Sequence, residues 1–211
     1  MFPNARKGIK KLFIAEILTI FAAILGLVST VINALPEVAA HPAGSIVLMV
    51  FALTSLFFVV VAFLLHLFGL FQGGRDSGHL RVAFWAVIFA LVFSVAASVL
   101  ETTLPSLPWL HTIFSTLAQV LNAFVIIYVI SGISSLAVRV GRLDVARRGT
   151  IMIWIILGIY LVSALLNILS GIFTGEPFVV FFAVVSIASA VLDLVIYIAY
   201  LFYLHTGTKI F

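Results

Sequence analysis

Residues 45–71 read SIVLMVFALTSLFFVVVAFLLHLFGLF, a run that contains no Asp, Glu, Lys or Arg. A helix needs about 20 mostly apolar residues to cross the hydrocarbon core of a bilayer. The rest of the chain has the same character, since 64% of its 211 residues are hydrophobic and only 9% are charged. Soluble domains have about 25% charged residues. The run therefore predicts a membrane-spanning helix in an integral membrane protein.

Five further apolar stretches of similar length lie between charged or Pro- and Gly-containing segments. Every backbone polar group must be paired within the protein when it lies in lipid, which favours helices for all six. We predict an all-α integral membrane protein, a six-helix transmembrane bundle built as three antiparallel hairpins. The short loops leave no room for a second domain in residues 1–211. The predicted spans are 12–35, 45–71, 82–100, 112–138, 150–174 and 178–205.

The positive charges are distributed on one side of this topology. All 11 Lys and Arg residues lie in the two terminal segments or in the second and fourth loops, whereas Glu37, Glu101 and Glu176 mark the other three loops. By the positive-inside rule, both termini are expected in the cytoplasm of a multi-pass protein of the cell membrane. The basic clusters are short and indicate contact with membrane lipids that carry anionic headgroups. They lack the basic face with polar and aromatic readers that nucleic-acid binding needs.

The chain carries traces of a threefold hairpin repeat. Residues Ala5–Gly8 (ARKG) correspond to Ala146–Gly149 (ARRG) at an offset of 141, and the same offset carries Pro36 onto Pro177. About half of that offset places Gly8 on Gly78. Pro and Gly stop helices at the ends of spans, so topology alone accounts for part of the agreement. Internal duplication and shared helix-end signals both remain open at this point.

Small residues follow one face of each odd-numbered span. In the first span, positions 16, 19, 23, 26, 30 and 33 fall at steps of 3 or 4 and are all small or polar. Such faces let helix backbones approach closely, within one chain, between two copies of it or against another membrane subunit. A lined pathway is the alternative to a packing face. The candidate packing residues are Ala23, Gly26, Thr30, Ala90, Ala97, Ala164 and Gly171.

Polar stripes follow the fourth and sixth spans, where an offset of 71 places Asn122 on Asp193. A carboxylate at the centre of a span costs roughly 2.5–3.5 kcal/mol on insertion scales, so Asp193 should face inward and protonate or find partners such as Tyr197. Glu16 is expected near the cytoplasmic boundary, about 7.5 Å of helical rise beyond Lys11. The candidate binding residues are Asp193, Asn122, Gln119, Ser115, Ser186, Tyr197, Tyr200 and Glu16.

Several kinds of chemistry are not indicated by the sequence. The chain has no cysteine, which excludes disulfides and thiol catalysis. Its five histidines are scattered at 41, 66, 79, 111 and 205, without the spacing of a metal site. No histidine in the middle of a span stands beside a serine as its base. We therefore expect no metal, no cofactor and no enzymatic activity.

Two functions of different classes fit these patterns. The first is a small transporter or channel that moves a small solute, a proton or a cation through a polar site around Asp193. The second is a membrane accessory, assembly or stress-linked scaffold protein whose polar residues only clamp helices together. A carboxylate in the middle of a span favours the first, because apolar contacts would serve a scaffold as well.

Overall fold

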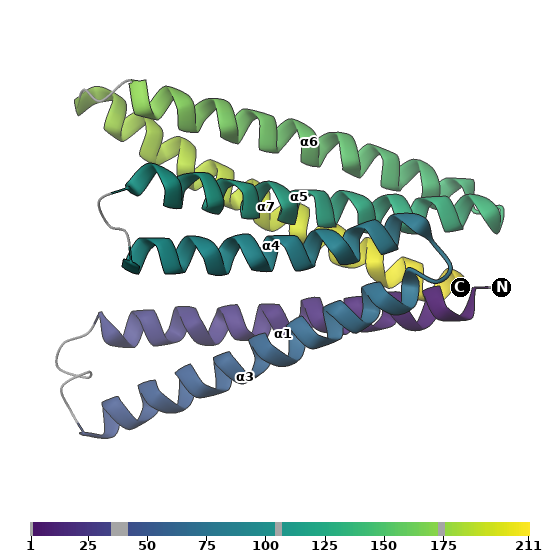
Figure 1. Cartoon of the computed structure of the whole chain (residues 1–211), viewed down its shortest axis with the longest axis horizontal. Coiled ribbons are helices and arrows are strands. Elements are labelled where there is room, and N and C mark those ends of the chain that lie inside the picture. The colour runs from purple at the N-terminus through teal and green to yellow at the C-terminus, as the bar shows by residue number, and fades with distance from the viewer. Residues whose placement is uncertain (1, 35–41, 104–106, 173–175) are drawn as a thin grey trace.

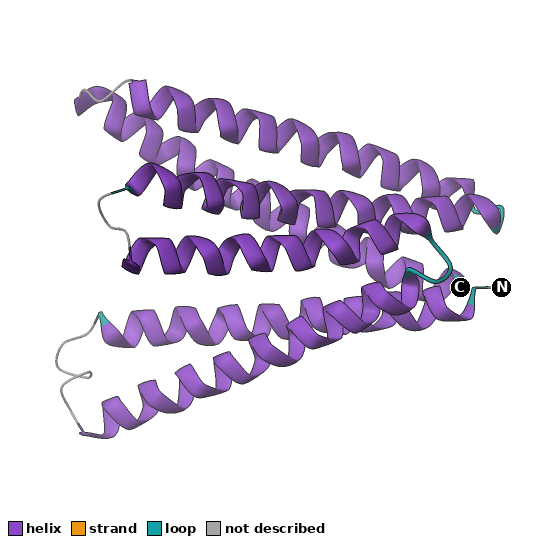
Figure 2. Cartoon of the chain, in the orientation of Figure 1, coloured by secondary structure: helices purple, strands orange, loops and turns teal. Residues whose placement is uncertain are grey.

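The computed structural model describes residues 2–34, 42–103, 107–172 and 176–211, and within helices it leaves undescribed the side chains of 42–44, 108, 109, 112, 163–191 and 193. The described backbone forms six helices and no strands (Figure 2). The helices are α1 (Pro3–Asn33), α3 (Pro42–Gly73), α4 (Gly78–Thr103), α5 (Pro108–Arg139), α6 (Leu143–Ile172) and α7 (Glu176–Ile210).

The expected all-α architecture is confirmed, and five helices are long and apolar enough to cross a membrane. These segments are Pro3–Asn33, Ser45–Gly73, Gly78–Thr103, Ile113–Arg139 and Leu143–Val162, and the corresponding part of α7 with described side chains is the shorter Leu194–Ile210. The helices continue beyond the predicted spans, because those spans covered only the apolar part. Basic residues such as Lys7 and Lys209 lie in these extensions, near the start of α1 and in the last turn of α7.

Successive helices run in alternating directions, so that both termini lie at the same end (Figure 1). There the rings of Phe2 and Phe211 contact each other, with centroids 6.4 Å apart. α1 packs along α3, α4 packs along α5, and α7 crosses behind them to contact α1, α5 and α6. The helices converge toward the termini, whereas the α1–α3 hairpin diverges from the others at the opposite end (Figure 1).

Prolines and one glycine set several of the helix ends. α1, α3, α5 and α7 each have a proline in the first turn, where its missing N–H leaves no hydrogen bond unmade. After α5, Gly141 has a positive φ of 76°, and the N–H of Arg142 donates to the carbonyl oxygen of Ala137 at 2.8 Å. This is a Schellman turn, which reverses the chain into α6 within three residues.

The buried core lies in the converging half of the bundle. Ile9, Leu12, Leu80, Ile133 and Leu204 come from four helices, and none of them has any exposed surface. In the diverging half the apolar side chains point outward, so that Leu27 is 66% exposed and Val31 62%. Lipid tails are as apolar as leucine, so burial alone does not hold these helices together, and close packing must do so.

A close backbone contact joins α1 to α3 through glycines. A Cβ placed on Gly8 would lie 2.5 Å from the carbonyl oxygen of Gly69 and 2.7 Å from the backbone nitrogen of Gly73. Gly69 and Gly73 form a G-x-x-x-G sequence, the spacing that lets two membrane helices approach backbone to backbone. Gly69 and Gly73 were not among the predicted packing residues. Its contact fixes the angle at which α3 crosses α1.

A second tight contact joins α5, α6 and α7. The hydroxyl groups of Ser134 and Tyr203 lie 2.7 Å apart in the interior, which is hydrogen-bond distance. Gly149 of α6 leaves room for them, since a Cβ there would collide with both oxygens. Gly8 and Gly149, matched in the repeat alignment, are therefore both close-packing positions. The repeat itself stays a prediction.

The small faces predicted for packing are occupied in α4 but not along the second half of α1. Ala90 and Ala97 are buried, with 4% and 5% exposure. Ala23 and Thr30 are exposed, and a Cβ on Gly26 would meet nothing within 4 Å, because α1 is leaving its neighbours there. The side chains of Ala164 and Gly171 lie outside the described residues. Among the buried residues of α1, Gly8 and Leu12 continue the stripe toward the N-terminus at steps of four before Glu16, whereas Ala15 and Ala22 lie directly beside its members Glu16 and Ala23.

Asp76, in the loop after α3, caps the start of α1. Its Oδ2 accepts the backbone N–H of Ala5 at 2.8 Å, and its Oδ1 accepts from the side chain of Asn4 at 3.1 Å. A carboxylate at a helix N-terminus satisfies free N–H groups and complements the helix dipole. Asp76→Ala should therefore lower the free energy of unfolding by about 1–2 kcal/mol. Unfolding in detergent measures this, with Glu101→Ala, whose side chain is 69% exposed, as the control. Equal stability of the two variants would contradict the capping role.

Candidate functional site

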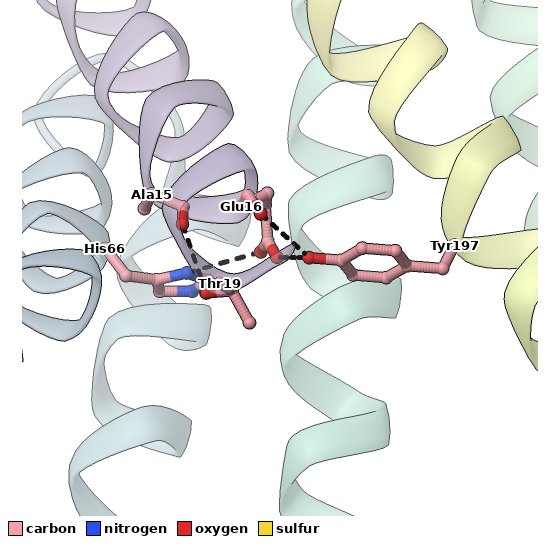
Figure 3. Close-up of polar contacts among 5 residues, drawn as sticks. All are labelled: Ala15, Glu16, Thr19, His66 and Tyr197. Carbon is pink, nitrogen blue, oxygen red and sulfur yellow. Dashed lines mark hydrogen bonds and ion pairs between the residues drawn. The ribbon is translucent and has the colours of Figure 1, made fainter. Parts of the chain in front are cut away.

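Glu16 lies on the inner face of α1, and its side chain is only 12% exposed. The hydroxyl of Tyr197, on α7, donates to Glu16 Oε2 at 2.6 Å and also lies 3.2 Å from the backbone oxygen of the same residue. On the other side, Nδ1 of His66, on α3, is 3.5 Å from Glu16 Oε1 (Figure 3). One carboxylate thus connects the first two helices of the chain to the last one.

His66 has one ring nitrogen at the carboxylate and the other without a partner. Its Nε2 is buried and makes no hydrogen bond to any residue that the structure describes. A neutral imidazole that donates from Nδ1 to Glu16 offers the lone pair of Nε2, whereas an imidazolium offers a second N–H. In either form, Nε2 keeps a hydrogen-bonding capacity that no described residue uses.

The carboxylate and imidazole face a cavity of about 520 Å³ between α1, α3, α4 and α5. Asn122 and Ser94 supply further polar groups, as does Thr19, whose hydroxyl donates to the carbonyl oxygen of Ala15 at 3.1 Å (Figure 3). The remaining wall is apolar. No Lys or Arg lines this cavity among the described residues, so its fixed charge is that of Glu16. The electrostatics favour a cation or a hydrogen-bond donor over an anion.

The structure brings together part of the predicted binding set. Glu16 and Tyr197 are in direct contact, and Asn122 lines the same cavity as Glu16. Tyr200, one turn beyond Tyr197, lies with Tyr197 in a separate cavity. Neither Ser115, which is partly buried, nor Gln119, which is exposed, lines either cavity. Asp193 and Ser186 belong to α7, and their side chains lie outside the described residues.

Sequence reasoning missed His66 and the contact between Tyr197 and Glu16. His66 is the only titratable residue in the run of residues 45–71, and a single histidine does not give the spacing of a metal site. A polar residue within a long apolar run was the available signal. Tyr197 was expected as a hydrogen-bond donor to Asp193, whose side chain lies outside the described residues. In the structure, the Tyr197 hydroxyl donates to Glu16 on the first helix. The described residues contain no group of three or more His, Asp or Glu that could hold a metal ion.

The apolar helices and their lipid-facing side chains are those of a multi-pass membrane protein. Comparisons with models of protein families, with curated proteins and with solved structures found no match to this chain.

Proposed function

We propose that this protein is a small transporter or channel for protons or small cations, with Glu16, His66 and Tyr197 at its central site. The observation that carries the proposal is the enclosed Glu16 carboxylate, which contacts His66 and Tyr197 and opens onto a cavity of about 520 Å³. An ionisable residue within a membrane span is costly and usually functional.

The chemistry of the lining supports a cation as the transported species. A cation in the cavity would meet the Glu16 carboxylate and the side-chain oxygen of Asn122, next to the imidazole of His66. A proton would reside on the His66–Glu16 pair. An anion would meet an unscreened carboxylate in a medium of low dielectric constant, which is unfavourable.

Asp193 remains part of the proposal. It precedes Tyr197 by one turn of α7 and so belongs to the same side of that helix. We also propose the orientation expected from the basic residues, with both termini in the cytoplasm and the protein in the cell membrane. Homo-oligomers or a second membrane subunit are proposed to cover the small-residue faces that are exposed in the single chain.

Flux into proteoliposomes tests the role of Glu16. Under a pH gradient or a potassium diffusion potential, the parent protein should move protons or monovalent cations faster than empty liposomes do. Glu16→Gln keeps the shape and can still accept from Tyr197, but it cannot titrate or carry charge. We expect its flux to fall about tenfold or more, because the variant removes the negative charge that attracts a cation and the group that would accept a proton. Glu101→Gln, at an exposed carboxylate, is the matched control and should retain the parent flux.

Two results would count against this proposal. If flux with the parent protein is no faster than with empty liposomes under either gradient, the protein does not transport protons or monovalent cations. Equal flux for the parent and Glu16→Gln would show that Glu16 is not at the transport site. Asp193→Asn in the same assay would then test whether Asp193 is part of that site.

The second candidate function is the non-transporting scaffold. It is supported by the same hydrogen bond, because the 2.6 Å contact between the Tyr197 hydroxyl and Glu16 Oε2 also joins α7 to α1. Hydrogen bonds between membrane helices contribute about 0.6–2 kcal/mol. A scaffold predicts that Tyr197→Phe lowers thermal stability while no variant shows ion flux.

A further inference from the structure

A second cavity, of about 250 Å³, lies between α5, α6 and α7. Four isoleucines and the three tyrosines Tyr160, Tyr197 and Tyr200 line it, and one of the isoleucines, Ile126, also lines the cavity at Glu16. The volume exceeds the roughly 150 Å³ of an engineered apolar cavity that holds benzene. It therefore has room for a small molecule with a compact apolar body.

Tyr200 lines this cavity with part of its side chain, and its hydroxyl is buried without a described partner. The side chain is 2% exposed, and its hydroxyl makes no hydrogen bond to any described residue. Most buried polar groups in folded proteins are hydrogen-bonded, because an unpaired one costs free energy. The hydroxyl oxygen can accept from an N–H donor and its hydrogen can be donated. A ligand with such a group would satisfy it.

The surroundings favour a positively charged ligand. Tyr197 lines the cavity, and its hydroxyl ends on the Glu16 carboxylate, which places a negative charge just beyond the wall. Tyrosine rings attract cations through their electron-rich faces. No Lys or Arg is among the described residues that line the cavity. A lipid tail would fill the isoleucine part but would leave both the hydroxyl and the charge unused.

We propose that this cavity is a binding site for a small protonated primary amine with an apolar body. The ammonium group donates a hydrogen bond to the Tyr200 hydroxyl oxygen, and the tyrosine rings together with the Glu16 carboxylate stabilise its charge. The isoleucines pack against the apolar body. This site goes beyond the proposed ion pathway and does not depend on ion movement, since binding at equilibrium requires no flux.

Equilibrium binding of labelled benzylamine to the full chain in lipid nanodiscs tests the site, after subtraction of binding to empty nanodiscs. We expect saturable binding to the parent and about tenfold weaker binding to Tyr200→Phe, because a hydrogen bond to a charged group is removed. Tyr200→Phe should fold, since the lost hydroxyl has no partner in the described structure. Tyr128→Phe is the matched control, since Tyr128 packs against His79 and lines neither cavity, and it should bind like the parent.

Benzyl alcohol, which is similar in size and uncharged, separates a charge-selective site from an apolar one. It should compete for the site at least about tenfold more weakly than unlabelled benzylamine, because it lacks the charge. Equal competition by the two compounds, unchanged binding to Tyr200→Phe, or absence of saturable binding would each overturn the proposal. Ion flux that depends on Glu16 without benzylamine binding overturns this site alone. Binding that depends on Tyr200 without ion flux leaves it standing and removes only the ion pathway.

Discussion

Replacing Gly8 by leucine is expected to lower the free energy of unfolding by about 3 kcal/mol, the upper end of the usual cost of overpacking. The first carbon of any side chain at this position would lie 2.5 Å from the carbonyl oxygen of Gly69. The obstacle is backbone, which cannot rotate away as a side chain can. α1 and α3 would have to separate, and because α3 carries His66, the distance between His66 and Glu16 would grow as well.

Gly78 provides a matched control for this substitution. It corresponds to Gly8 in the repeat alignment and also lies in the first turns of a helix, but a Cβ there would meet nothing within 4 Å. Gly78→Leu should therefore stay within about 0.5 kcal/mol of the parent, like most surface changes. Chemical unfolding of both variants in the same detergent compares them directly. If Gly8→Leu is as stable as Gly78→Leu, the two helices do not meet at this glycine contact.

The helices of this protein could be predicted because each of them satisfies a local rule. Apolar runs of about 20 residues bounded by charges, Pro or Gly mark spans, and proline in the first turn marks several starts. The rotation of a helix follows from the same periodicity, so the buried alanines of α4 fall on its stripe of small residues. Which positions of a stripe meet a neighbouring helix does not follow from either pattern. Ala23 shows this, since it lies on the stripe of small residues and is exposed although α3 still contacts α1 beside it, where the Ser55 hydroxyl donates to the carbonyl oxygen of Ala22 at 3.0 Å.

The site was harder to predict because its members come from the first, second and last helices. Glu16 and Tyr197 are separated by 181 residues, and no sequence pattern links a tyrosine on one helix to a carboxylate on another. Each polar residue inside a span could be recognised as costly, but its partner depends on how the helices cross. The crossing of α1 and α3 is set by Gly8, Gly69 and Gly73, which is a property of backbone approach.

Leu80→Ala is expected to have the second largest effect on stability. This side chain has no exposed surface and fits between two helices that lack side chains at the contact. A Cβ on Gly73 of α3 would lie 2.7 Å from Leu80 Cδ1, and one on Gly132 of α5 would lie 2.8 Å from Leu80 Cγ. Leu80, at the start of α4, therefore packs between α3 and α5 and holds the α1–α3 hairpin against α5. Neither glycine can fill the space that a shorter side chain would leave.

The expected loss for Leu80→Ala is about 2 kcal/mol, at the lower end of the 2–5 kcal/mol seen for such substitutions in soluble proteins. The expected loss of stability lies at the lower end of this range because lipid, not water, surrounds the helices. Lipid is as apolar as the leucine side chain, so the transfer contribution is small and the lost packing contacts and the cavity account for the cost. Leu53→Ala on α3 is the control, because Leu53 is 55% exposed on the apolar surface and removing it leaves no cavity. Unfolding in detergent that gives the same loss for both variants would show that Leu80 does not lock the hairpins together. A loss confined to Leu80→Ala would show that the contact of Leu80 with Gly73 and Gly132 holds the α1–α3 hairpin against α4 and α5, the helices that line the cavity at Glu16 together with that hairpin.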